Sequence, residues 1–188
     1  MRTVYLYTAD LTETGHAAQH RAGRELLAHA LADRGLPAPP VIQTDANGKP
    51  FLPDSPTLHF SISHCQNKVV CALCDAPLGV DLERERPLRA PVASRICSSS
   101  ESADTPAAFF SLWTAKEAAV KAVGLGLRFP LRAVEIGKIQ SGTIRVGETA
   151  CFLRRFPSAD SWHLAVCVVG EQDFLLHFIP TIASSDRK

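Results

Sequence analysis

Two acidic side chains alternate with apolar ones along a short segment, Gly79-Val80-Asp81-Leu82-Glu83. On a strand, Asp81 and Glu83 share one face, with their Cα atoms about 7 Å apart. Two carboxylates at this spacing repel each other unless a cation lies between them, and a hard divalent ion such as Mg²⁺ takes oxygen ligands of this kind. The same pattern also fits an ordinary solvated strand face, so the pair alone leaves both interpretations open.

A second group of polar side chains lies on a predicted helix over residues 106–123. Trp113, Glu117 and Lys121 fall at successive i, i+4 positions and therefore project from one face. Glu followed by Lys at this spacing is also a common surface ion pair. If this face lies opposite the acidic strand, Glu117 becomes a third carboxylate for the cation. Lys121 then supplies a positive charge for a phosphate that the metal also contacts.

Further groups that donate hydrogen bonds to phosphate oxygens precede the acidic strand. Lys49 lies in Gly48-Lys49-Pro50, and Ser63 and His64 close the segment Ser61-Ile62-Ser63-His64. A lysine, a hydroxyl and an imidazole all suit an anion site. Each also fits a structural role, as a turn lysine or as polar residues at a strand end.

The elements that must position these residues follow from hydrophobic periodicity and from turn residues. Helices are expected over 16–32 and 106–123, the second between a Thr105 cap and a Gly124 stop. Strands are expected over 4–7, 59–63, 68–74, 78–83, 134–139, 143–146, 150–156, 162–169 and, at an edge, 174–179. The consecutive strands over 59–63, 68–74 and 78–83 are expected to form a hairpin.

This irregular order of helices and strands favours an α+β fold built on antiparallel sheet. We expect one compact domain over 1–182, with two similar α+β lobes, an N-lobe of about 1–84 and a C-lobe of about 106–182. A variable linker with one helical turn joins the lobes, and residues 183–188 form a loose tail.

Composition narrows the classes of function. The 188 residues are 46% hydrophobic, which suits one globular domain, and the net charge of +1 gives no general attraction to nucleic acid or to an anionic membrane. No segment has the continuous apolar run of a secretory signal or a membrane span. Cys71 and Cys74 stand at an odd offset on a predicted strand and so point to opposite faces, which disfavours a metal or redox pair. A reduced, cytoplasmic protein is expected.

Four blocks of the sequence, in this order, resemble those of the 4′-phosphopantetheinyl transferase superfamily. They are N-G-K-P-F-L-P-D, F-S-I-S-H-C, L-G-V-D-L-E and L-W-T-A-K-E-A-A-V-K-A-V-G-L-G-L. The likeness runs from about residue 21 to residue 127 and is closest to the larger, monomeric branch that serves peptide and polyketide synthases. A monomer with that fold is the expectation.

The resemblance implies transfer of the 4′-phosphopantetheine group of coenzyme A to a serine hydroxyl of an apo acyl or peptidyl carrier protein. Adenosine 3′,5′-bisphosphate would be released. It also implies that Mg²⁺, or Mn²⁺, is held on the pyrophosphate by Asp81, Glu83 and Glu117, with Lys121 on the same phosphates. The proton of the serine would pass to a metal-activated water or to Glu101.

For the nucleotide end, especially its 3′-phosphate, the resemblance implies binding by Arg21, Lys49, Ser63 and His64. Arg24 is one turn further along the first helix and is the alternative to Arg21. Basic side chains of the linker and of the helix end are expected to attract acidic carrier proteins. They are Arg84, Arg86, Arg89, Arg95 and Arg128.

Two other functions fit part of this pattern. Three carboxylates and a lysine around Mg²⁺ also suit a phosphohydrolase or nuclease with water as nucleophile, although a nuclease would carry a basic stripe. A catalytically silent scaffold that binds coenzyme A or a carrier protein is the other alternative. The alternative of a catalytically silent scaffold is disfavoured, because Asp81, Glu83, Glu117 and Lys121 are all present.

Overall fold

The computed structural model describes residues 1–13, 15–88, 92–126, 129–157 and 160–180 of the chain. The predictions made for Arg89, Arg128 and the 183–188 tail lie outside these residues. Among the helices that are described, none is both long and apolar enough to cross a membrane.

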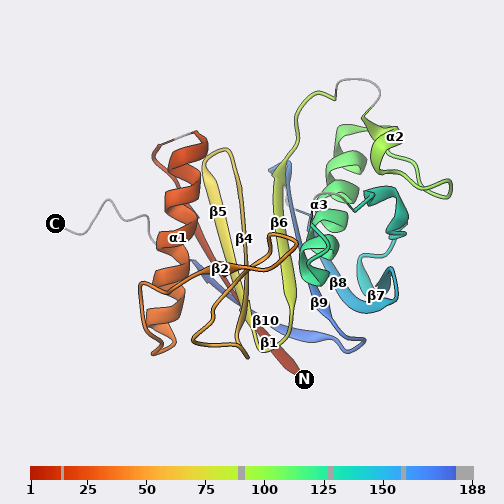
Figure 1. Cartoon of the computed structure of the whole chain (residues 1–188). Coiled ribbons are helices and arrows are strands. Elements are labelled where there is room, and N and C mark those ends of the chain that lie inside the picture. Colours follow the sequence, from red (N-terminus) through yellow and green to blue (C-terminus); the bar gives the residue numbers. More distant parts are fainter. Residues whose placement is uncertain (14, 89–91, 127–128, 158–159, 181–188) are drawn as a thin grey trace.

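Figure 1 labels most of the helices and strands of the described residues. Within the described residues there are three α-helices and one 3₁₀ helix: α1 (His16–Asp33), α2 (Ala93–Ile96), α3 (Pro106–Val123) and η1 (Leu131–Ala133). The strands are β1 (Arg2–Asp10), β2 (Gln43–Thr44), β3 (Pro50–Phe51), β4 (His59–Cys65), β5 (Lys68–Cys74), β6 (Leu78–Arg84), β7 (Ser141–Val146), β8 (Thr149–Pro157), β9 (Trp162–Val169) and β10 (Phe174–Pro180).

The long strands form two four-stranded sheets, ordered β10-β1-β5-β4 and β6-β9-β8-β7. All their pairs are antiparallel except β1 with β10, which run parallel. Figure 1 shows α1 along the first sheet and α3 along the second, with the strands between them. The predicted α+β class is confirmed.

The sheets cross the lobe division that the sequence suggested. Strand β6, placed in the N-lobe by that division, pairs with β9, and β10, placed in the C-lobe, pairs with β1. The predicted β4–β5 hairpin is present, but β6 leaves it for the other sheet. Residues of both sheets share one core cluster, which includes Val70 and Val80.

Strands β4 and β6 are edge strands of different sheets and meet through side chains. The hydroxyl Oγ of Ser61 accepts a hydrogen bond from the backbone N–H of Val80 at 3.0 Å, and Oγ of Ser63 accepts one from Leu82 at 3.2 Å. These serines satisfy backbone donors that an edge strand would otherwise leave buried without partners. The two sheets, and the helices that cover them, therefore meet along this β4–β6 seam.

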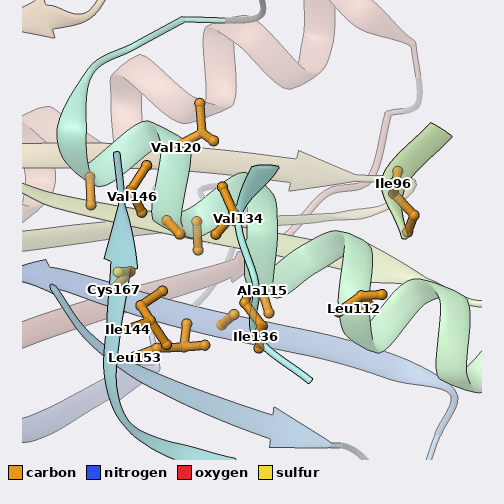
Figure 2. Packing of buried hydrophobic residues seen from close by; sticks show 14 of the residues in the cluster. Ile96, Leu112, Ala115, Val120, Val134, Ile136, Ile144, Val146, Leu153 and Cys167 are labelled. Atoms are coloured by element: carbon orange, nitrogen blue, oxygen red, sulfur yellow. The ribbon is translucent and has the colours of Figure 1, made fainter. Parts of the chain in front are cut away.

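Helix α3 has the bounds that the sequence predicted. Oγ1 of Thr105 accepts a hydrogen bond from the N–H of Ala108, and Gly124 ends the helix in the left-handed conformation with φ 77°. The apolar face of α3 packs against the second sheet and the segment that follows the helix, and Figure 2 shows Ala115, Val134 and Ile136 in this cluster.

The predicted strand over 134–139 is wrong. The 3₁₀ helix η1 ends at Ala133, and the segment that follows it has no strand but a turn at Gly137, where φ is 56°. The backbone N–H groups of Ile136 and Gly137 donate to Oε1 of Glu101, at 2.9 and 3.0 Å, instead of to a neighbouring strand. The alternating apolar residues Val134 and Ile136 are buried, as a strand would bury them, but in a loop.

Cys71 and Cys74 lie on opposite faces of a strand, as predicted. Cys71 belongs to the core cluster under α1, whereas Cys74 belongs to the cluster shared by the two sheets, so they lie on opposite faces of β5. All six cysteines lie within the described residues and are free thiols.

Candidate functional site

A cleft of about 900 Å³ lies between α1 and α3, over the β4–β6 seam. This volume is in the range of pockets that take small organic ligands and cofactors. Its walls come from α1, the 42–50 segment, β4 and the C-terminal half of α3. The polar and charged residues that line it are Gln19, His20, Arg24, Thr44, Asn47, Lys49, Ser61, His64, Glu117 and Lys121.

One oxygen of Asp81 is buried beside this cleft without a hydrogen-bond partner. Its Oδ1 accepts hydrogen bonds from Nζ of Lys121 at 2.6 Å and from Oγ of Ser63 at 2.8 Å. Its Oδ2 has no partner, and the residue is only 5% exposed. A buried carboxylate oxygen without a partner is costly, and such groups are found where a ligand or ion is bound.

Glu117 lies close enough to this carboxylate for their charges to interact. Burial raises the pKa of Glu117, the charge of Lys121 lowers it, and the charges of Asp81 and Glu83 raise it further. The charges of Asp81, Glu83 and Lys121, all singled out in the sequence, therefore act on the carboxyl group of Glu117. A cation placed among the carboxylates would relieve their mutual repulsion.

Glu83 has a different partner in this arrangement. Its Oε2 accepts a hydrogen bond from Nη1 of Arg86 at 2.7 Å and lies 3.5 Å from Sγ of Cys65. The guanidinium of Arg86 also lies over the ring of Phe110, 4.5 Å from its centroid. In the part of the chain that is described, no three His, Cys, Asp or Glu side chains are gathered as a ready metal site. Arg86 occupies only Oε2 of Glu83, so the other carboxylate oxygen could still bind an ion.

The basic end of the cleft differs from the prediction at Arg21. This arginine forms an exposed ion pair with Glu13, at 2.7 Å, and is not one of the described residues that line the cleft. Arg24, the alternative, does line it, and so does His20, which lies one turn before Arg24 on the same helix. His64 lines the cleft as predicted. Sequence analysis missed His20, although its i, i+4 relation to Arg24 is visible in the sequence.

Lys49 and Ser63 make contacts that the sequence did not show. Nζ of Lys49 donates to the backbone oxygen of Ala122 at 2.7 Å, near the end of α3, and to that of Leu78 at 3.4 Å. Burial lowers the pKa of Lys49. Ser63 is not among the described residues lining the cleft, and its hydroxyl instead orients the carboxylate of Asp81.

Glu101 is a buried anchor away from these groups. Its side chain is 2% exposed, and it accepts hydrogen bonds from the ammonium of Lys116 and from the backbone of Ser98, Ile136 and Gly137. Burial raises its pKa, but these hydrogen bonds outweigh burial and lower the pKa to about 2. A carboxylate held in this way is a poor proton acceptor at neutral pH. The structure does not bring Glu101 to the cleft.

Replacing Glu101 by Gln is expected to cost about 3 to 5 kcal/mol of unfolding free energy at pH 7, because it leaves the fully buried Lys116 without a counter-charge. The folded pKa of about 2 is below the ordinary 4.5, so this stabilisation is present above about pH 4.5. This stabilisation is lost as the pH falls towards 2, so the difference in unfolding free energy between the variant and wild type should then narrow. Urea unfolding across this range measures it. Glu148→Gln, at a fully exposed position, is the control, and an equal, small effect of both changes would contradict the assignment.

Three of the predicted basic rim residues are described. Arg84 lies over the ring of Trp162, 5.6 Å from its centroid, Arg86 pairs with Glu83, and Arg95 is exposed on α2. Arg84 and Arg86 therefore lie where β6 leads into the linker. They are close to Asp81, Glu83 and Glu117, which together are called the acidic group.

Comparisons with known proteins agree with the motifs. The family pattern of the 4′-phosphopantetheinyl transferase superfamily matches residues 77–168. The 4′-phosphopantetheinyl transferase psf-1 of Bacillus pumilus is 32% identical over 159 residues, which are 77% of this chain and 68% of that protein. The 4′-phosphopantetheinyl transferase Sfp of Bacillus subtilis (strain 168) is 32% identical over 136 residues, which are 66% of this chain and 61% of that protein.

A further 4′-phosphopantetheinyl transferase of Bacillus subtilis is 33% identical over 132 residues, or 64% of this chain. The chain spans 59% to 68% of the length of these three relatives. The family pattern covers β6, α3 and β9, and so includes the acidic group and Lys121. The chain belongs to the 4′-phosphopantetheinyl transferase superfamily.

Proposed function

We propose that this protein transfers the 4′-phosphopantetheine group of coenzyme A to a serine hydroxyl of an apo acyl or peptidyl carrier protein and releases adenosine 3′,5′-bisphosphate. The observation that carries the proposal is the buried, unpartnered Oδ2 of Asp81, beside Glu117 and Lys121 at a cleft whose other end is basic. Such a cleft suits a ligand that carries a pyrophosphate and a further phosphate. The names of the similar proteins support the same reaction.

The acidic group fits a hard divalent cation, Mg²⁺ or Mn²⁺. Asp81, Glu83 and Glu117 would hold it, Glu83 through the carboxylate oxygen that Arg86 does not contact. When bound, such an ion supplies positive charge for the phosphate oxygens, which is what phosphoryl transfer chiefly needs. The oxygen chemistry of these ligands suits either metal.

Lys121 is the residue of this chain best placed to bind the pyrophosphate. Its side chain is 33% exposed, lines the cleft and contacts Asp81 through the ammonium group. A lysine ammonium has three donors, so it can bind the carboxylate and a phosphate oxygen together. The pair therefore orients the pyrophosphate against the acidic group, where a serine hydroxyl can attack in line.

The proton of that serine needs an acceptor. The four hydrogen bonds and the low pKa of Glu101 argue against that residue, which the sequence had suggested. A water molecule held by the acidic group is the other candidate, and Glu83 and Glu117 are the residues that would orient it.

The carrier protein would dock beside this group, where Arg84 and Arg86 provide positive charge at the start of the linker. Acidic partners are steered to such surfaces. We propose a cytoplasmic monomer that acts on carriers of this kind.

Release of adenosine 3′,5′-bisphosphate tests the proposal and separates it from the alternatives. The protein is incubated with coenzyme A and Mg²⁺, with and without an apo carrier protein, and the products are separated by liquid chromatography. Release that requires the carrier supports the transferase. Release without it would indicate a hydrolase instead, and binding of coenzyme A without any release would indicate a scaffold.

A further inference from the structure

Two histidines lie side by side at the start of α1, and the proposed reaction uses neither of them. His16 is the first residue of the helix and His20 follows one turn later, so the two side chains project from the same face. Their Nε2 atoms lie 3.1 Å apart. Both residues are exposed, so an ion in solution can reach their ring nitrogens.

The distance between these two nitrogens suits one metal ion held by both rings. An imidazole nitrogen binds Zn²⁺ at about 2.0 to 2.1 Å, so two of them on a tetrahedral ion are about 3.3 Å apart. On a square-planar Cu²⁺ ion, the right angle brings them to about 2.8 Å. The observed 3.1 Å lies between these values. A hydrogen bond between the rings has the same length, so a third ligand is needed to favour an ion over a shared proton.

His64 of β4 supplies a third imidazole. Its ring centroid lies 5.3 Å from that of His20 and 6.3 Å from that of His16, while the centroids of His16 and His20 are 4.3 Å apart. Three imidazoles on one tetrahedral ion have centroids about 5 Å apart, so each separation differs from that arrangement by about 1 Å at most. No three ligands are gathered ready-made in the described residues, so the third ring must turn to close the site.

The chemistry of these rings selects the kind of ion. Imidazole nitrogens suit transition-metal ions such as Zn²⁺, Cu²⁺ and Ni²⁺, whereas Mg²⁺ prefers oxygen ligands. A ring must be neutral to bind a metal. Burial lowers the pKa of His64, and the neighbouring His20, Lys121 and His16 lower it further, so this ring is in the form that binds metal at neutral pH.

We infer that His16 and His20 bind one transition-metal ion, such as Zn²⁺, and that His64 turns to become its third ligand. These three residues are called the His16–His20–His64 site. It goes beyond the proposed function, in which Mg²⁺ or Mn²⁺ is held by the carboxylates of the acidic group.

Occupation of this site affects the cleft. His20 and His64 line the cleft from α1 and from β4, so an ion bound by both rings joins these two walls. A ligand that enters between the walls then meets an obstruction. Zn²⁺ is therefore expected to lower the affinity of the cleft for its ligand. Only this consequence rests on the proposed function, because it needs a known ligand of the cleft.

Calorimetric titration of the whole protein with Zn²⁺ tests the site itself. The titration is made at about pH 7.5, where imidazoles are largely neutral, and in excess Mg²⁺, which occupies the acidic group. We expect about one Zn²⁺ per chain. His16→Ala and His64→Ala should each weaken its binding at least tenfold, since even the outer-shell partners of metal ligands are worth about that much.

Two control variants should bind Zn²⁺ as wild type does. His177→Ala removes an exposed imidazole from β10, away from the proposed site. Cys65→Ser removes a half-buried thiol close to Glu83. Unchanged Zn²⁺ binding in His16→Ala, or loss of binding in Cys65→Ser, would overturn the site. Unchanged binding in His64→Ala would overturn the role of the third ring.

Electron paramagnetic resonance of bound Cu²⁺ counts the ligands independently of affinity. The wild-type spectrum should show coupling to imidazole nitrogens, and His16→Ala should show coupling to fewer of them. A spectrum without nitrogen coupling in the wild-type protein contradicts the inference.

The consequence for the cleft has a separate test. Adenosine 3′,5′-bisphosphate, which has no thiol to bind the metal, is titrated into the protein with and without Zn²⁺. Its affinity should fall about tenfold with Zn²⁺ in wild type but remain unchanged in His16→Ala. Equal affinity in wild type with and without Zn²⁺ overturns the obstruction. If the nucleotide does not bind at all, the proposed function fails while the Zn²⁺ titration still decides the site.

Discussion

Replacing Asp81 by Asn is expected to slow carrier modification by about a thousandfold, which corresponds to about 4 kcal/mol of lost transition-state stabilisation. Asn has nearly the shape of Asp but lacks the charge that Oδ2 contributes beside Glu117. The variant should also bind Mn²⁺ weakly, measured by electron paramagnetic resonance without any substrate. The hydroxyl of Ser63 and the ammonium of Lys121 remain in place but lose their charged partner.

Asp75→Asn is the matched control, because Asp75 precedes the same strand but its side chain is 72% exposed. It should retain wild-type Mn²⁺ binding and turnover. Thermal unfolding of both variants separates loss of the ion from loss of the fold. An Asp81→Asn protein that is folded, binds Mn²⁺ normally and keeps a rate within a few-fold of wild type would refute the metal assignment.

Gly79→Ala is expected to cost at least 3 kcal/mol of unfolding free energy. A methyl group at Gly79 would overlap the backbone oxygen of Ala118 and lie 2.5 Å from the backbone nitrogen of Ala122. These are helix backbone atoms and cannot turn aside as a flexible side chain can. Helix α3 would have to move away from β6, which would separate Asp81 from Lys121. Stability by urea unfolding and carrier modification should therefore both fall.

Gly142→Ala provides the comparison, since Gly142 is also in a strand and its added methyl group would meet only the side chain of Ile139, at an ordinary 3.5 Å. That variant should lie within about 1 kcal/mol of wild type. Equal stability of the two alanine variants would show that α3 and β6 do not pack this closely.

Local signals explain which elements could be predicted. The bounds of α3 follow from Thr105 before the helix and Gly124 after it, and both make the contacts expected of caps. The segment over 134–139 could not be predicted, because its backbone donors bind Glu101, which is 35 residues before Ile136 in the chain. The sequence shows the apolar alternation but not the partner of the backbone.

The candidate site shows the same difference between residues placed by local patterns and residues placed by contacts with distant parts of the chain. The alternation of β6 and the i, i+4 spacing of α3 predict the acidic group, because each pattern is local and the two elements pack face to face. Which of His20, Arg21 and Arg24 lines the cleft depends on the rotation of α1 about its axis against the first sheet. The packing of a few side chains sets that rotation. The Glu101–Lys116 pair joins the linker to α3 and has no local signature.

Intact-protein mass spectrometry of an apo carrier protein is the most direct test of the central claim. The carrier is incubated with this protein, coenzyme A and Mg²⁺, beside a reaction that contains EDTA. The account predicts a gain of one phosphopantetheine mass that requires the metal and that maps to a serine. If fatty-acid, polyketide and peptide carriers all keep their original mass while coenzyme A binds the protein, the claim of transfer is contradicted.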